Sequence, residues 1–241
     1  MQVNIILDSL IIVSFESYLS RLVVIAFSNS GVCDSFSEYY RTPHVFEIMS
    51  LEQICLVIDF DGFMFGKKFL VREMGYCSLI STRAVNDSIR FDLTKYWNEL
   101  TERDKKTNLY ITRNIHGLSF RPFYKEHDCF PEEYLTYFLE NLYRTIRGED
   151  NSQLIVAYKG GIHEKRILDE LNIPSINLEK FGCPKYDNLL SSYDLNHLPV
   201  TCGYHSKLTK RNTFTAHCAK SECLVFAQWI QKQIGDKEQY H

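Results

Sequence analysis

Residues 54–63 read ICLVIDFDGF, an apolar run that ends in two aspartates separated by one residue. Successive side chains of a strand point to opposite faces, so a strand here would place Asp59 and Asp61 on the same face. Two carboxylates at the end of a buried strand are costly unless a cation or hydrogen-bond donors compensate their charge. The run therefore predicts either a divalent-metal site or a strand end capped by polar loops.

The 241-residue chain has the composition of an ordinary globular protein, with 45% hydrophobic and 24% charged residues. This length suits one sizeable α/β domain or two small ones. The net charge of −3 gives no overall basic signature, so any nucleic-acid surface must be a local patch. The eight cysteines lie mostly in apolar runs, which favours reduced thiols in an intracellular protein, cytoplasmic or nuclear.

Residues 1–50 are interpreted as an N-terminal appendage to a domain that spans residues 51–241. The apolar N-terminal stretch is interrupted by Asp8, Glu16 and Arg21. Its longest uncharged run falls short of the roughly 20 residues that a membrane span needs. No basic segment precedes an apolar core, so neither a signal peptide nor membrane association is expected.

The remaining chain alternates strands and helices. Strands are expected at residues 54–63, 68–80, 88–93, 153–158 and 175–178. Helices are expected from Pro131 to about 146, at 163–171 and at 219–233, and residues 95–106 predict a short helix and a loop. The order β-β-β-α-β-α-β-α predicts a three-layer α/β fold, with helices on both faces of a mixed sheet. Its first three strands favour an antiparallel meander, and QLIVAY at 153–158 is typical of a parallel strand.

Three further residues are candidates to join the aspartates. Glu164 lies in the first turn of a helix that follows Gly160-Gly161, although a solvated glutamate at a helix start is common. His217 precedes the last helix and Glu222 lies five residues later. A histidine there can accept a proton from water, and the glutamate can bind a metal ion.

Together these motifs resemble the DnaQ-like, DEDDh-type 3′–5′ exonucleases of the ribonuclease H-like superfamily. The matches are Asp59-Phe60-Asp61 on the family's Asp-x-Glu, Glu164 on its middle aspartate, and His217 with Glu222 on its His-x4-Asp. Residues 71–75, VREMG, are similar to the family's second strand, and the resemblance covers roughly residues 53–233. It implies that the four carboxylates hold Mg²⁺ or Mn²⁺ and that His217 acts as general base on single-stranded RNA or DNA.

Three of the four carboxylates depart from the family pattern in length. Asp61 stands where the family has a glutamate, whereas Glu164 and Glu222 stand where it has aspartates. A methylene shifts a ligand by about 1 Å, and a misplacement of that size costs about two orders of magnitude in rate. The resemblance therefore implies the fold more directly than the activity.

A second set of residues is similar to the zinc motif of the Maelstrom domain, a relative of the same fold known from the animal piRNA pathway. The sequence CGYH supplies Cys202 and His205 at a spacing that suits a tetrahedral zinc site, and Cys218 follows. Carried over residue by residue, the Glu-Cys-His-Cys set would be Glu73, Cys202, His205 and Cys218. The alternative is a buried cysteine pair beside a core histidine. The HMG box that often accompanies the domain is absent.

Two functions are therefore expected, and both involve nucleic acid. The first is a nucleic-acid-processing protein related to 3′–5′ exonucleases, with altered or lost activity among the possibilities. The second is a non-catalytic Maelstrom-like module of a small-RNA silencing pathway, stabilised by zinc, that binds RNA or protein.

Lysines and arginines at 159, 165, 166, 207, 210 and 211 are candidates for a basic rim or for ordinary solvated surface. His116, before Gly117, is interpreted as part of a structural turn or as a cleft residue.

Overall fold

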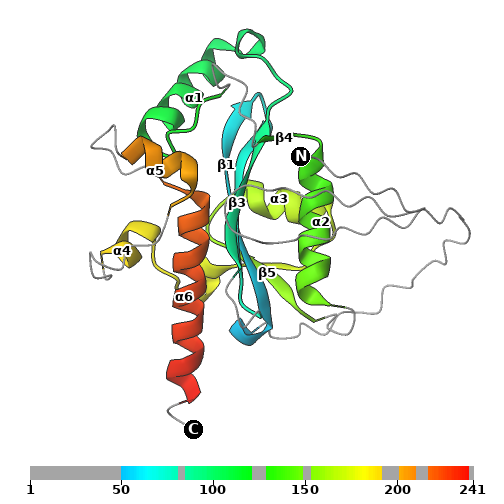
Figure 1. Cartoon of the computed structure of the whole chain (residues 1–241), viewed down its shortest axis with the longest axis vertical. Coiled ribbons are helices and arrows are strands. Elements are labelled where there is room, and N and C mark those ends of the chain that lie inside the picture. The colour runs from blue at the N-terminus through cyan, green and yellow to red at the C-terminus, as the bar shows by residue number, and fades with distance from the viewer. Residues whose placement is uncertain are drawn as a thin grey trace, which may run out of the picture. The chain divides into compact units, whose positions relative to one another are not determined.

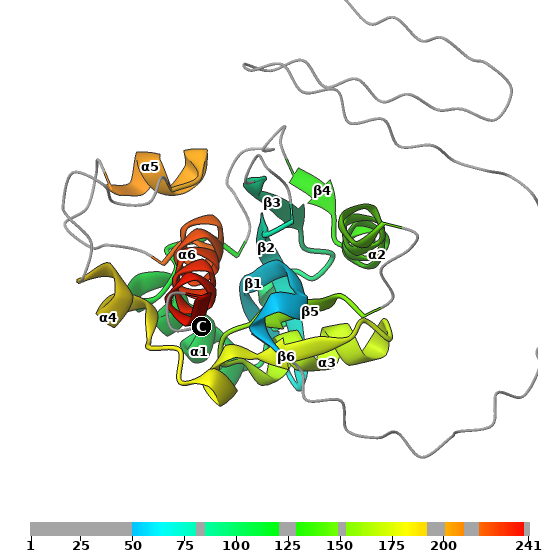
Figure 2. The ribbon, with the colours of Figure 1, turned by 90° about the horizontal axis from the view of Figure 1, so that it is seen from below.

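A computed structural model describes residues 50–80, 85–120, 129–148, 153–191, 201–209 and 217–238 of the chain. Six strands form one sheet in the order β4-β3-β2-β1-β5-β6, and helices cover both of its faces (Figure 1, Figure 2). The predicted α/β class and mixed sheet are confirmed. The proposed appendage, residues 1–50, lies outside the described residues except for Ser50.

The three longest strands form the expected meander. They are β1 (Ile54–Phe65), β2 (Lys68–Ser78) and β3 (Asn86–Asp92), and both pairings are antiparallel. The short strands are β4 (Cys129–Pro131), β5 (Ile155–Tyr158) and β6 (Ser175–Asn177), and they pair in parallel with β3, β1 and β5 respectively. The parallel strand predicted at 153–158 is thus confirmed, with β1 on one side of it and β6 on the other.

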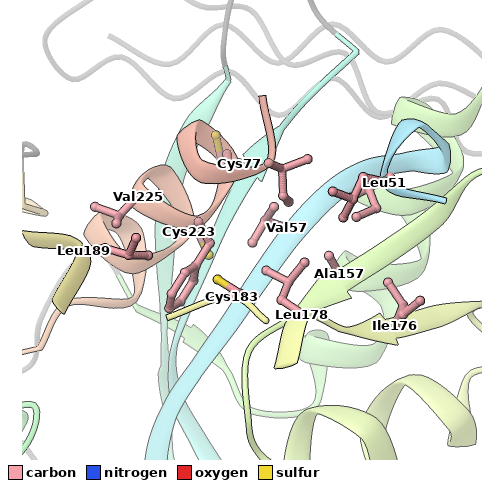
Figure 3. Packing of buried hydrophobic residues seen from close by; sticks show 14 of the residues in the cluster. Leu51, Val57, Cys77, Ala157, Ile176, Leu178, Cys183, Leu189, Cys223 and Val225 are labelled. Carbon is pink, nitrogen blue, oxygen red and sulfur yellow. The ribbon is translucent and has the colours of Figure 1, made fainter. Parts of the chain in front are cut away.

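Alternation along β1 divides the core between the two faces of the sheet. One face is covered by α6 (Ala219–Glu238) and α4 (Tyr186–Leu190), and here Val57 packs in a cluster with Cys223 and Leu189 (Figure 3). The other face is covered by α2 (Tyr134–Arg147) and α3 (Ile162–Glu170), and here Leu56 and Ile58 share a cluster with helix side chains. Asp59 and Asp61 continue the alternation of Val57, so they belong to the face under α6.

β1 continues past the aspartates to Phe65, two residues beyond the predicted end at residue 63. The hairpin partner β2 follows it throughout, with a register shift between Asp61 and Gly62. Pairing with β5 extends only to Val57, so the aspartates lie beyond the end of the parallel pair. They therefore occupy the edge where β5 turns into α3.

Helix α1 (Glu102–Asn114) closes the far end of this hairpin through polar contacts. Asn108 accepts a hydrogen bond from the amide of Met64 and donates one to the Met64 carbonyl, at 2.8 and 2.9 Å. The amide of Gly66 donates to Asp104 at 3.0 Å. Residues 95–106, predicted as a short helix and a loop, contain the 3₁₀ helix η2 (Trp97–Glu99) and the start of α1. The extension of α1 to Asn114 was not predicted, because the helix is held by capping and polar contacts that leave little apolar periodicity in its sequence.

The predicted helix start at Pro131 is also wrong. Pro131 ends β4, a strand absent from the sequence-based assignment, and α2 begins at Tyr134. The Glu132 carboxylate accepts hydrogen bonds from the amide and hydroxyl of Thr94, at 3.0 and 2.9 Å. These bonds tie residues 129–132 to the end of β3 and delay the helix by a turn.

A close backbone approach at Gly75 fixes the start of α6 on the sheet. A Cβ at Gly75 would lie 2.2 Å from the backbone carbon and oxygen of Ala219, the first residue of α6. Only glycine permits this separation, because no neighbouring side chain can move aside to relieve a clash with backbone. The approach sets the positions of Cys218, just before α6, and of Glu222 in its first turns.

We expect Gly75→Ala to destabilise the protein by about 1–3 kcal/mol, the usual range for overpacking in a core. The matched control is Gly235→Ala in α6, where an added Cβ meets nothing within 4 Å. That substitution should be neutral or stabilising by up to about 1 kcal/mol, because alanine favours helix over glycine. Urea unfolding followed by circular dichroism measures both changes, and equal effects would contradict the role given to Gly75.

Candidate metal centres

Four carboxylates from three elements gather at the edge where β5 turns into α3. Asp59 and Asp61 come from β1, Glu164 from the first turn of α3 and Glu222 from α6. Asp61 and Glu164 are only 8% and 7% exposed, so the solvated alternative for Glu164 is wrong. The charges of both glutamates raise the pKa of each aspartate. The four predicted residues therefore lie close enough together to form one cluster.

The diglycine turn delivers Glu164 into this cluster. Gly161 has φ +29°, and a Cβ there would lie 1.4 Å from Glu164 Oε2, so a side chain at 161 would displace the carboxylate. Asn177 fixes the turn, because its amide group donates to the Gly160 carbonyl at 3.1 Å and accepts from the Gly160 amide at 3.2 Å. The sequence signal for Gly160-Gly161 as a turn is thereby confirmed, whereas Asn177 carried no signal of its own.

The cluster has an excess of negative charge. Burial raises the pKa of Asp59 and Asp61 well above its usual value, and the neighbouring carboxylates, with Glu222 first among them, raise it further. Burial also raises the pKa of Glu164, and the backbone amides of Glu164 itself and Phe60 oppose that rise. Asp61 Oδ2 and Glu164 Oε2 are buried without a hydrogen-bond partner among the described residues. Unpaired carboxylate oxygens in this setting suit a cation with oxygen ligands, such as Mg²⁺ or Mn²⁺.

His217 bonds to a member of the cluster. Its Nδ1 lies 2.6 Å from Glu222 Oε1, and its Nε2 lies 3.8 Å from Asp187. The hydrogen bond to Glu222 raises the pKa of His217, so the imidazolium form is favoured and offsets part of the negative charge. The sequence prediction that His217 and Glu222 act together is confirmed as a contact, and their chemical roles stay predictions.

The second predicted set forms a compact, buried cluster that could hold a metal ion. One donor atom from each of Glu73, Cys202, His205 and Cys218 lies within 4.8 Å of every other. Cys202 Sγ is 3.0 Å from His205 Nδ1, and His205 Nδ1 is 3.4 Å from Glu73 Oε2. The oxygens of the four carboxylates around Asp61 do not all lie within 4.8 Å of one another in the described residues.

Local bonds orient His205 as a metal ligand. Its Nε2 lies 2.7 Å from the His116 carbonyl oxygen, which can only accept, so Nε2 carries the proton. The lone pair of Nδ1 is then available on the side of Cys202 and Glu73. A metal-binding histidine usually donates its other ring N–H in this way. Ser88 Oγ similarly donates to Glu73 Oε1 at 3.1 Å and leaves Oε2 toward the cluster.

Without a cation this cluster contains poorly compensated polar groups. Burial raises the pKa of Glu73 to about 8, and Glu73 Oε2 has no hydrogen-bond partner among the described residues. The Cys218 thiol donates to Cys202, which lowers the pKa of Cys202 and raises that of Cys218. Two sulfurs, an imidazole and a carboxylate in a closed, buried site are a donor set that fits a tetrahedral metal ion.

Three residues of the predicted basic rim, on α3 and beside it, lie close to acidic side chains. Lys159 pairs with Glu179 at 2.9 Å and Lys165 with Asp169 at 2.7 Å. Arg166 lies 3.7 Å from Glu170. Positions 210 and 211 lie outside the described residues. These pairs make the region a mixed-charge surface, because each cation has an acidic partner on its own helix or on a neighbouring segment.

Comparison with protein-family models, with curated proteins and with solved structures yields no match to this chain. The site is therefore described from the chain's own residues. In the part of the chain that the structure describes, no helix combines the length and apolar character needed to cross a bilayer.

The cluster around His205 predicts a metal-bearing protein. Gel-filtered protein should carry one metal ion per chain, and Cys218→Ala should lower the affinity more than the 10–100-fold typical of losing a ligand's hydrogen-bond partner. Elemental analysis after dialysis against a weak chelator measures both. Cys183→Ala is the control, since it removes a buried thiol near α6 that is not part of the cluster. Metal retained by Cys218→Ala as by Cys183→Ala would contradict the site.

The raised pKa of Asp61 predicts that the difference in stability between wild type and Asp61→Asn depends on pH. A carboxyl whose pKa is higher in the folded than in the unfolded state contributes stability that is lost as pH rises from the unfolded value. In chelator, wild type should therefore lose stability relative to Asp61→Asn above about pH 4, by at most about 1.4 kcal/mol per pH unit. Chemical denaturation at several pH values tests this, and Mg²⁺ should reduce the difference. A pH-independent difference would contradict the interpretation.

Proposed function

We propose that this chain is a ribonuclease H-like domain of the DnaQ type that processes nucleic acid with divalent metal ions. The observation that carries the proposal is the gathering of Asp59, Asp61, Glu164 and Glu222, from β1, α3 and α6, at one sheet edge. The buried, unpaired oxygens of Asp61 and Glu164 favour a cation there. The order of strands and helices that brings them together agrees with the resemblance in motif order.

The reaction proposed is hydrolysis of a phosphodiester bond at the 3′ end of single-stranded RNA or DNA. Bound Mg²⁺ or Mn²⁺ would supply charge stabilisation for the phosphate oxygens and a water of lowered pKa. The carboxylates would hold the ions, and His217 would accept the proton of the attacking water at its Nε2, which faces away from Glu222. To do so, His217 must be neutral, and cations in the cluster favour that form by repelling the imidazolium.

A second candidate function is a non-catalytic, Maelstrom-like module that binds RNA or protein. One specific observation favours it: the cluster whose donors meet within 4.8 Å is Glu73, Cys202, His205 and Cys218, not the carboxylates. We propose that zinc occupies this cluster in a structural role, because thiolates select Zn²⁺ and four protein ligands leave no open position. The Glu222–His217 bond supports the same alternative, because it joins a proposed metal ligand to the proposed general base.

An intracellular location, cytoplasmic or nuclear, agrees with either candidate. Every cysteine among the described residues is a free thiol. Oxidising compartments favour disulfides, whereas reduced thiols and thiolate-bound zinc are typical of the cytoplasm and nucleus.

A nuclease assay distinguishes the two candidates. End-labelled single-stranded RNA and DNA are incubated with the protein in Mg²⁺, Mn²⁺ or chelator. We expect shortening from the 3′ end that depends on the ion and falls by at least about 100-fold in Asp59→Ala, because a metal ligand is lost.

The control variant is Glu170→Gln, which changes an exposed carboxylate on the same helix as Glu164. It should retain wild-type activity. Activity that survives Asp59→Ala, or that is absent with either ion while the protein binds the labelled strands, rejects the catalytic reading. The second of these results supports the binding module instead.

A further inference from the structure

The segment Ile115–His116–Gly117 joins the two candidate centres through its backbone. Its three successive carbonyl oxygens each accept a hydrogen bond from a segment that carries a site residue. The donors are the amide of His217 at 2.9 Å to Ile115, Nε2 of His205 at 2.7 Å to His116, and the hydroxyl of Tyr204 at 3.2 Å to Gly117. The segment is thus bonded to the proposed base and to a proposed metal ligand at once.

The ring of His116 adds a third connection, to the strand that carries the aspartates. The ring of His116 is buried, with 1% of the residue exposed. Its Nδ1 accepts from the Leu118 amide at 2.9 Å. Nε2 therefore carries the proton and donates to the carbonyl of Gly62 at 3.1 Å. A turn alone requires Gly117, at φ +69°, and does not require both ring nitrogens to be bonded.

Gly62 transmits this contact to the carboxylate cluster. It follows Asp61 directly, and the β1–β2 register shifts between the two residues. A Cβ at Gly62 would lie 2.1 Å from the Leu70 carbonyl oxygen, so the backbone is tightly confined on the side of β2. The His116 bond and this confinement together restrict the backbone of Gly62, the residue bonded directly to Asp61.

We propose that His116 is a positioning residue that couples metal binding at Glu73, Cys202, His205 and Cys218 to metal binding at the carboxylate cluster. The inference rests on the proposed function of both centres. An ion on His205 fixes its ring, the ring holds the His116 carbonyl, and the His116 ring holds the Gly62 carbonyl beside Asp61. The same segment fixes the backbone of His217. Because coupling is reciprocal, each ion must change the affinity for the other by the same factor, typically 5–150-fold.

Two substitutions at His116 separate the coupling from the fold of the turn. The side-chain oxygen of His116→Asn can replace Nδ1 and accept from Leu118, but its amide cannot reach Gly62. The amide N–H of His116→Gln can replace Nε2 and donate to Gly62. We therefore expect His116→Asn to bind both ions without coupling and His116→Gln to restore the coupling.

The first readout is the Mn²⁺ dissociation constant, measured from the paramagnetic resonance of free Mn²⁺. This Mn²⁺ dissociation constant should differ at least 5-fold between zinc-loaded and zinc-depleted protein, both in wild type and in His116→Gln. In His116→Asn the two dissociation constants should be equal within twofold. Tyr143→Phe is the matched control and should keep the wild-type ratio. It removes another buried side-chain bond to a backbone carbonyl, 2.6 Å to Leu154, on the face covered by α2.

The second readout does not require metal-free protein to remain folded. One equivalent of Co²⁺ at the thiolates gives visible absorption that reports the geometry of that centre. Mg²⁺, which thiolates do not bind, is then added as a silent titrant. The cobalt bands should shift with saturation in wild type and in His116→Gln, and stay unchanged in His116→Asn.

The outcomes distinguish this inference from the function on which it rests. If both ions bind without mutual effect, or if His116→Asn keeps the wild-type coupling, the inference is overturned and the proposed function stands. If cobalt gives no thiolate absorption, or if Asp61→Asn leaves Mn²⁺ binding unchanged, the centres themselves are rejected and the inference with them.

Discussion

The contact between the backbone of Ala219 and Gly75 is the constraint on which both candidate centres depend. It places the start of α6 directly on β2, without an intervening side chain. Cys218 then lies beside Glu73, which precedes Gly75 by two residues on β2. The Ala219 amide hydrogen-bonds to Asp61 on β1. The first turns of α6 also bring Glu222 to the aspartates, and His217, just before the helix, contacts Glu222. One close approach therefore supplies residues to two centres at once.

Buried negative charge is compensated differently in the two candidate centres. Around Asp61, like charges come from three elements and raise one another's pKa, and His217 contributes a compensating cation through its bond to Glu222. Around Glu73, sulfur, nitrogen and oxygen donors converge closely enough to share a single ion. Asp61 and Glu73 are register partners on neighbouring strands, about 5 Å apart, so ions in both centres would also repel each other. Contacts that hold the ligands in place oppose that repulsion.

The sequence was most informative where a residue's chemistry and its spacing agreed. The strand alternation of residues 54–63 placed Asp59 and Asp61 on one face, and the C-x2-H spacing brought Cys202 and His205 together. Contacts between distant segments were not predictable from such patterns. Nothing in the sequence indicates that Asn177 binds the diglycine turn or that the ring of His116 reaches Gly62. Helix α1 escaped assignment because its contacts are polar, and Pro131 misled because a proline suits a strand edge as well as a helix start.

The ligands of the His205 centre are spread along the chain from Glu73 to Cys218, and this order has a consequence for biosynthesis. Three of the four leave the ribosome late, after every strand of the sheet has been made. The emerging chain can therefore assemble its sheet while the thiol pair is still incomplete. Metal binding at this candidate centre would have to follow synthesis of Cys218, and a chain that stops before residue 218 lacks the ligand needed to close the site. In this sense the centre would distinguish finished from unfinished protein.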